Sequence, residues 1–211
     1  MIRKWLAVFA GISGIALYNW WILVPFRPGV LISPNELFSD LEVTGHPFAV
    51  AMQRADFAAG VLILMAFLLV GSSKRRADFR EWVAMLVFAV AGAAGGLFPE
   101  TCTNGISAAC RSLEWGFRLP GSHYIHIVAG IVEFGSITLA LVFAYKRTHG
   151  SDTLSARIYH MLGKGAFAAY LLLAIAYLFN VMGSVIEPVF FLGFSIIVVL
   201  QLFERMKISD S

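Results

Sequence analysis

The chain has 211 residues, of which 59% are hydrophobic and only 14% carry a charge, and its mean hydropathy is +0.78. This composition excludes an ordinary soluble domain, whose surface must be solvated. The formal net charge of +3 does not indicate nucleic-acid binding, because the basic residues form small clusters beside apolar segments, a placement typical of membrane topology. We therefore expect an all-α membrane protein with one domain over residues 1–211, in contact with membrane lipids and with no nucleic acid.

The first apolar segment covers about residues 5–25 and follows Arg3 and Lys4, so its start resembles a signal peptide. It is too long for one, and the sequence YNWW at residues 18–21 stands where a small-residue cleavage site would be. We interpret it as a retained first helix whose aromatic end lies at the membrane interface.

The connection over residues 26–47 contains the sequence SPNELFSDLEVTG. Ser33 is a candidate N-cap, Pro34 takes the first helical position and Glu36 the third, a pattern typical of a capping box. We expect a short interfacial helix here that ends near Gly45.

Five further apolar segments are each long enough to cross a bilayer. The last two are separated by the sequence NVMGSVIEP, which interrupts the apolar run after His160. These spans are expected at residues 47–70, 82–98, 123–145, 165–183 and 187–203. With the first segment they predict a bundle of six transmembrane helices.

Lys and Arg residues in the short connections indicate the orientation of the bundle. If both termini and the even-numbered connections lie on one side, that side holds twelve basic residues and the other side three. The richer side should be cytoplasmic, which predicts an N-in/C-in topology in a bacterial cytoplasmic (inner) membrane. The twelve are Arg3, Lys4, Lys74, Arg75, Arg76, Arg80, Lys146, Arg147, Arg157, Lys164, Arg205 and Lys207, and the three are Arg27, Arg111 and Arg118.

The two cysteines, Cys102 and Cys110, lie in one connection that this topology places outside. An oxidising compartment would let them pair, and neither stands in a cytosolic metal or redox motif. We therefore predict a disulfide between them.

Three motifs occur along the chain: SDLEVTGHP at residues 39–47, GLFPETC at residues 96–102 and HYIHIVAG at residues 123–130. In these motifs, and in their order, the chain resembles a family of bacterial and archaeal membrane proteins catalogued as domain-of-unknown-function family 998. The resemblance covers nearly the whole chain. It implies a six-helix membrane fold and no established chemistry, so it assigns no catalytic residue.

Ionisable residues within spans are costly and usually face the bundle interior or a wet cavity, so each is a candidate for function. Arg54 and Asp56 lie within the second span, Glu133 lies near the middle of the fourth, and His126 lies one turn from its outer end. The cytoplasmic half holds nothing comparable. We therefore expect an outward-opening polar site between the second and fourth spans.

His126 and Glu133 are seven residues apart and share one helix face. With Asp56 they are the candidate catalytic residues, because imidazole and carboxyl groups in a low-dielectric crevice suit proton transfer. Arg54 and Asp56 are two residues apart, so Asp56 should line the crevice while Arg54 extends sideways or toward the interface. In a purely structural role, Arg54 would instead pair with Asp56 or Glu133. The candidate substrate-binding residues are Arg54, Glu100, Ser39 and His46.

His123 and His126 are three residues apart and can both reach one divalent metal ion such as zinc. Catalytic zinc normally has three protein ligands, so a third donor would be needed. The alternative is that both are interfacial histidines at a helix start capped by Ser122. The available third donors are His46, Asp56, Glu100 and Glu133.

Three classes of function fit these features. The first is a hydrolase or transferase that acts on a lipid or lipid-linked substrate at the outer leaflet. The second is a small transporter or lipid-handling protein, which the lack of a visible inverted repeat makes less attractive. The third is a noncatalytic membrane subunit, which should tolerate substitutions at His126 and Glu133.

Overall fold

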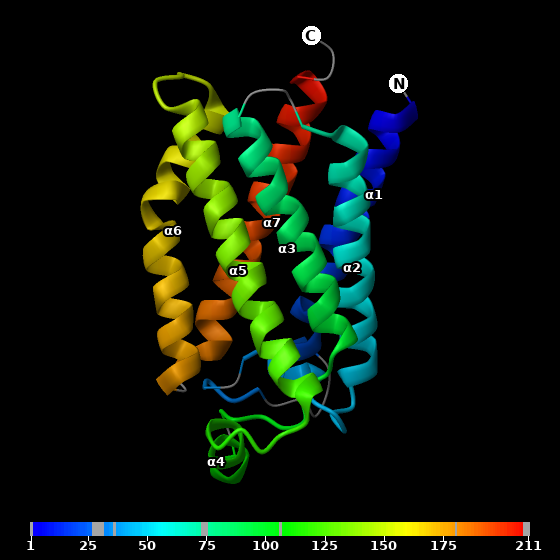
Figure 1. Cartoon of the computed structure of the whole chain (residues 1–211), viewed down its shortest axis with the longest axis vertical. Coiled ribbons are helices and arrows are strands. Elements are labelled where there is room, and N and C mark those ends of the chain that lie inside the picture. The colour runs from blue at the N-terminus through cyan, green and yellow to red at the C-terminus, as the bar shows by residue number, and fades with distance from the viewer. Residues whose placement is uncertain are drawn as a thin grey trace.

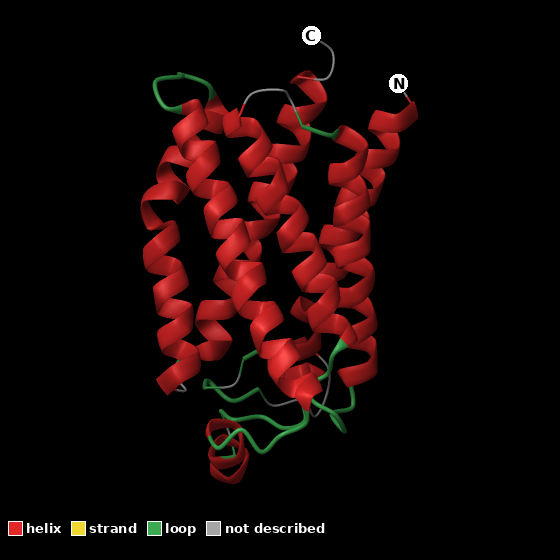
Figure 2. Cartoon of the chain, in the orientation of Figure 1, coloured by secondary structure: helices red, strands yellow, loops and turns green. Residues whose placement is uncertain are grey.

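The computed structural model describes residues 2–26, 32–35, 37–72, 76–105, 107–179 and 181–208. Within these ranges every regular element is helical (Figure 2). Six helices are long and apolar enough to cross a membrane, so the protein is an all-α, multi-pass membrane protein. They are α1 (Ile2–Tyr18) with its 3-10 continuation η1 (Trp20–Phe26), α2 (Ala49–Val70), α3 (Arg76–Leu97), α5 (Gly121–Thr148), α6 (Leu154–Phe179) and α7 (Gly183–Ile208).

The six long helices form a closed ring. Each packs against the next in the order α1, α2, α3, α5, α6 and α7, and α7 returns to α1. Helix α1 begins and α7 ends at the same end of the bundle, termed the terminal end (Figure 1). The opposite end carries η2 (Ser39–Glu42) and α4 (Ala108–Trp115) and is termed the loop end. Which compartment each end faces stays a prediction.

Helix α3 lies between α2 and α5 (Figure 1). The expectation that the second and fourth spans are direct neighbours is therefore wrong. Small residues explain how side chains of α2 and α5 still meet, because α3 carries the sequence AGAAGG at residues 91–96. At Gly96 an added Cβ atom would lie 2.4 Å from both the Gln53 carbonyl oxygen and the Phe57 nitrogen of α2. Such an approach between helix backbones is typical of small residues at membrane helix interfaces.

The observed helix boundaries depart furthest from the predicted ones in the first span and in α6. The first span stops being α-helical at Tyr18 and continues as η1, which contains Pro25. Helix α6 begins at Leu154, well before the predicted residue 165, so His160 is helical rather than part of a connection. The chain turns between the last two spans near Met182, whose φ is 53°.

The connection between the first two spans forms a four-residue 3-10 helix, η2, rather than an α-helix starting at Ser33. Ser33 accepts a hydrogen bond from the Asn35 nitrogen at 3.4 Å, while the Asp40 carboxylate accepts one from the Leu37 nitrogen at 2.7 Å. The expected capping residue Glu36 lies outside the described residues. So do Arg27, Lys74 and Arg75 of the basic residues counted above.

Helix α4 is a loop-end element that the sequence pattern did not predict. The Ser107 hydroxyl caps its first turn by accepting a hydrogen bond from the Cys110 nitrogen at 3.1 Å. The predicted disulfide between Cys102 and Cys110 is confirmed, with Cα atoms 5.9 Å apart. It fastens the start of α4 to the segment that follows α3.

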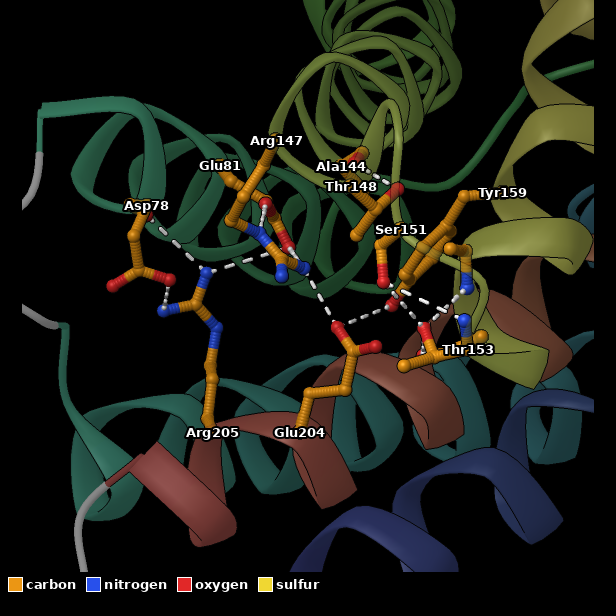
Figure 3. Close-up of polar contacts among 12 residues, drawn as sticks. Asp78, Glu81, Ala144, Arg147, Thr148, Ser151, Thr153, Tyr159, Glu204 and Arg205 are labelled. Carbon is orange, nitrogen blue, oxygen red and sulfur yellow. Dashed lines mark hydrogen bonds and ion pairs between the residues drawn. The ribbon is translucent and has the colours of Figure 1, made fainter. Parts of the chain in front are cut away.

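A buried ionic network joins α3, α5 and α7 at the terminal end (Figure 3). Arg147 donates to Glu81 at 2.7 Å and to Glu204 at 2.6 Å. Arg205 and Asp78 form an ion pair at 2.9 Å, with each side chain only 3% exposed. The expectation that this half of the bundle holds no comparable ionisable residues is therefore wrong, because α3, α5 and α7 extend beyond their predicted ends and carry these residues inside.

Candidate functional site

A cavity of about 320 Å³ lies inside the ring of helices, toward the loop end. All six long helices contribute to its wall, together with η1, η2 and the segment after α3. A largely apolar wall with a few convergent polar groups is the usual form of a small-molecule site. The apolar part includes Trp21, Met52, Phe134, Leu173 and Phe191, and the polar part includes Tyr18, Ser39, Glu42, Asp56, Glu100, His126, Glu133, Tyr170, Tyr177 and Glu187.

The structure brings the three candidate catalytic residues Asp56, His126 and Glu133 to the wall of this one cavity. They come from α2 and α5, on either side of α3. Two of the candidate substrate-binding residues, Glu100 and Ser39, also line it.

Arg54 and His46, the other two candidate substrate-binding residues, do not line the cavity. Arg54 is exposed on α2, two residues from Asp56 and on another side of the helix. The His46 ring lies 5.7 Å from the Phe48 ring, and its Nδ1 accepts a hydrogen bond from the Phe48 nitrogen at 3.3 Å.

Glu133 reaches the cavity past Gly92 of α3. A Cβ atom on Gly92 would lie 2.6 Å from Glu133 Oε1, so the missing side chain leaves room for the carboxyl group. The Tyr18 hydroxyl and the Asp56 carboxyl group interact with Glu133 from α1 and α2. The Oε1 atom is buried and has no hydrogen-bond partner among the described residues.

Glu42 of η2 lies against Asp56 of α2, and their carboxyl groups interact directly. Burial and the neighbouring carboxylate of Asp56 raise the pKa of Glu42 well above its usual range. A protonated Glu42 can donate to Asp56, so the pair can hold one shared proton. Glu42 Oε2 is buried without a hydrogen-bond partner in the described part of the chain.

His126 and Glu100 face each other at the loop end of the cavity. His126 Nδ1 lies 3.0 Å from the carbonyl oxygens of both Gly95 and Phe98. Carbonyl oxygens only accept, so Nδ1 carries the proton and Nε2 is the atom that can accept one. Nε2 lies 4.0 Å from Glu100 Oε1. Burial, and then the nearby carboxylates of Asp40 and Glu114, raises the pKa of Glu100 well above its usual range.

His123 has different partners from His126. Its Nδ1 accepts a hydrogen bond from the Thr101 nitrogen at 3.2 Å, so Nε2 carries the proton that faces Glu114 Oε2 at 3.3 Å. Both ring nitrogens of His123 are therefore engaged. The described residues contain no group of three or more His, Cys, Asp or Glu side chains placed to hold a metal ion.

Glu114 of α4 anchors the loop end over the cavity. Its carboxylate accepts hydrogen bonds from Asn104 at 2.8 Å and from the Tyr177 hydroxyl of α6 at 2.8 Å. With His123 of α5 as a third contact, Glu114 ties α4 to two spanning helices. The disulfide-bonded segment is thereby held close to Tyr177, which lines the cavity.

Five polar residues of the wall were missing from the predicted site: Tyr18, Glu42, Tyr170, Tyr177 and Glu187. Glu187 Oε2 accepts hydrogen bonds from the backbone nitrogens of Phe38 and Ser39, which places η2 over the cavity. A signal for Glu187 existed, because α7 starts at Gly183 and encloses this carboxyl group one turn inside a span. For Tyr18 and Glu42 the position depends on how the loop end folds, which no local pattern indicates.

The cavity reaches the outer surface of the bundle between α5 and α6. Ile131 of α5 and Leu178 of α6 line the cavity, yet they are 55% and 42% exposed. The Tyr170 hydroxyl of α6 donates a hydrogen bond to the Ile131 carbonyl oxygen at 3.2 Å beside this opening. In a membrane-spanning bundle, an opening at this place faces lipid.

Comparison with known proteins agrees with the resemblance seen in the three sequence motifs. No curated protein and no solved structure matches the chain. The model of one protein family, described as "Protein of unknown function (DUF998)", matches residues 10–203. The match spans almost all of the six-helix bundle and every polar residue of the cavity wall, and the chain therefore belongs to this family.

Proposed function

We propose that the protein is a membrane-embedded hydrolase or transferase whose lipid or lipid-linked substrate enters the cavity between α5 and α6. The observation that carries this proposal is the pairing of His126 with Glu100. The imidazole is held by two backbone carbonyl oxygens so that Nε2 faces a buried carboxyl group inside a cavity open to lipid. A base and an acid that lie this close can both contact the reacting group of a substrate beside them in the cavity.

His126 would act as the general base. Its Nε2 takes the proton of a water molecule, or of an acceptor hydroxyl in a transferase, as that oxygen attacks an ester or phosphoester centre. Glu100, whose pKa is raised by burial, would act as the general acid and give a proton to the oxygen of the leaving group. The proton on His126 then returns to Glu100, which restores the starting state. Asp56 and Glu133 lie deeper in the cavity and would position the polar part of the substrate.

We also propose that the loop end faces the outside of a bacterial cytoplasmic membrane. The twelve-to-three distribution of basic residues supports this orientation. The disulfide at the loop end supports it independently, because disulfides persist in oxidising compartments. The substrate would then come from the outer leaflet.

The experiment compares lipids from cells that lack the gene and carry wild-type protein, His126→Gln or Asp152→Asn. Asp152 is exposed in the connection between α5 and α6, so its variant is a matched control. Mass spectrometry of the total lipids should show one or more species that change with wild type and the control but not with His126→Gln. Equal amounts of the three proteins in the membrane fraction exclude an insertion defect. Identical lipid profiles for wild type and His126→Gln would contradict the enzymatic proposal.

A proton-coupled transporter is the second candidate, and the two ends of the bundle favour it. Carboxyl groups extend from Glu42 at the loop end to Glu133 deeper in the cavity, whereas at the terminal end Arg147 binds the acids Glu81 and Glu204 (Figure 3). Carboxyl groups that line a cavity inside the bundle would suit proton relay in a carrier. A transporter would change the location of a solute without producing any new lipid species, so the same lipid comparison separates the two functions.

A further inference from the structure

The charge of the cavity wall indicates the chemistry of the ligand. We propose that the cavity binds a cationic ammonium head group of an amphiphile whose apolar chain leaves between α5 and α6. The proposal rests on the proposed function for the lipid-side entry of the substrate and specifies its head group. Four observations support it.

The first observation is the one-sided charge of the wall. Its ionisable side chains include the carboxyl groups of five residues, and none of the described residues that line it is a lysine or arginine. Arg54, the basic residue nearest in sequence to Asp56, is exposed outside the cavity. Burying a carboxylate without a nearby cation is unfavourable in free energy. A cationic ligand would therefore stabilise these carboxyl groups. The five residues are Glu42, Asp56, Glu100, Glu133 and Glu187.

The second observation concerns single atoms. Glu133 Oε1 and Glu42 Oε2 are buried acceptors with no hydrogen-bond partner among the described residues. Their residues are only 8% and 2% exposed, and both line the cavity. Buried polar atoms usually have partners, so two such acceptors in one cavity point to a donor from a ligand. An ammonium group offers N–H donors and positive charge together.

The third observation is the contrast with the terminal end (Figure 3). There, each of the buried acids Glu81 and Asp78 faces a guanidinium group, from Arg147 and Arg205 respectively. The same bundle therefore supplies cations from its own chain where buried acids hold helices together. Among the described residues, no guanidinium or ammonium group pairs with the carboxyl groups of the cavity, which distinguishes them from a structural network.

The fourth observation is the raised pKa of Glu42 and of Glu100. Burial among other carboxylates favours the protonated form of both groups, which is a sign of missing positive charge. The same wall contains the aromatic residues Tyr18 and Trp21, and aromatic rings attract ammonium ions. The apolar residues Ile131 and Leu173 on α5 and α6 suit the attached chain.

The test uses purified full-length protein in a maltoside detergent, whose head group is uncharged. Three amphiphiles with the same chain, dodecylammonium, dodecanol and dodecanoate, are titrated below their micellar concentrations, and bound molecules are counted by native mass spectrometry. Dodecylammonium should bind at least about tenfold more tightly than dodecanol, and dodecanoate should bind most weakly. Glu133→Gln and Glu42→Gln should each reduce the preference for ammonium about tenfold, whereas Asp152→Asn should leave it unchanged.

Equal or tighter binding of dodecanol or dodecanoate to the wild-type protein would overturn the proposal, and this comparison requires no variant to fold. Retention of the ammonium preference in both glutamine variants would overturn it too. The assay needs no turnover, so it can fail independently of the enzymatic proposal. Ammonium preference without any His126-dependent lipid change would contradict only the enzyme, and the reverse result would contradict only the head group.

Discussion

Glu133 on α5 lies against Gly92 on α3, where a Cβ atom would stand only 2.6 Å from Glu133 Oε1. Helix α3 therefore separates α2 from α5 without closing the space between their carboxyl groups. A single missing side chain allows Glu133 to share the cavity with Asp56 and Tyr18. The cavity thus depends on a residue of α3 that carries no chemistry of its own.

Substitution Gly92→Ala should displace the Glu133 carboxyl group from the cavity. The contact is with the end of a flexible side chain, so the bundle should adapt and remain folded. We expect dodecylammonium binding to weaken about tenfold, a change of about 1.4 kcal/mol, with little change in the thermal midpoint. Gly165→Ala in α6, where a Cβ atom meets nothing within 4 Å, is the control. Unchanged binding in Gly92→Ala would show that Glu133 is not held by this contact.

Substitution Gly96→Ala should act on stability instead of binding chemistry. Here the Cβ atom would lie 2.4 Å from backbone atoms of Gln53 and Phe57, which cannot move without the whole of α2. Overpacking of this kind costs about 1 to 3 kcal/mol. We expect a lower midpoint of denaturant or thermal unfolding in detergent than for Gly165→Ala. Equal midpoints for the two variants would contradict the close contact between Gly96 and the backbone of α2.

Stability should fall as the pH rises, because Glu42 holds its proton more tightly in the folded protein than in the unfolded chain. Burial is the main cause of the raised pKa of Glu42, and the carboxyl groups of Asp56, Glu100 and Glu133 raise it further. This stabilisation is complete below the unfolded pKa of about 4.3 and is lost as the pH passes the raised folded pKa. The thermal midpoint should therefore decrease as the pH rises from the unfolded pKa through the raised folded pKa. The variant Glu42→Gln should show a weaker dependence of the thermal midpoint on pH, whereas Asp152→Asn should behave like wild type. If Glu42→Gln kept the wild-type slope, Glu42 would not be the cause of the pH dependence.

The number and kind of spans could be predicted because each depends on a local property, the length of an apolar run. The disulfide could be predicted for a similar reason, since Cys102 and Cys110 lie in one short connection. The order of the helices in the ring could not, because apolar periodicity does not specify which helix packs against which. The small residues of α3 were the available signal, and they indicate close packing without naming the neighbour.

Part of the candidate site was also accessible to sequence reasoning. Asp56, His126 and Glu133 stood out because ionisable groups are rare in spans, and all three line the cavity. Glu42 could not be predicted in this way, because it becomes buried only when η2 folds over the bundle. Arg147 and Arg205 counted only as topology markers near helix ends, although their side chains point inward to acids on other helices.

The orientation of the bundle is open to a direct measurement. A reporter that requires the cytoplasm should be active when fused after Lys207, and a reporter that requires the periplasm should be active when inserted near Asn104. The reason is the twelve-to-three distribution of basic residues, since positively charged connections are retained inside. As a control, the insertion should leave the disulfide between Cys102 and Cys110 intact, as judged by alkylation before and after reduction. Periplasmic activity at the C-terminus would reverse the assignment.

The ionic network at the terminal end should be a stability element rather than part of the cavity chemistry. Arg205→Met removes the cation that lies 2.9 Å from Asp78 and leaves a buried carboxylate uncompensated (Figure 3). Breaking one side of such a pair costs about 3 to 5 kcal/mol, whereas removing both charges is often nearly neutral. We therefore expect a large drop in the unfolding midpoint for Arg205→Met and a substantial recovery in the double variant Asp78→Asn with Arg205→Met. Dodecylammonium binding by the double variant should equal that of wild type, since neither residue lines the cavity. If the double variant were as unstable as Arg205→Met alone, the two residues would not stabilise the protein as a pair. If it lost ammonium binding, the network at the terminal end would be coupled to the cavity.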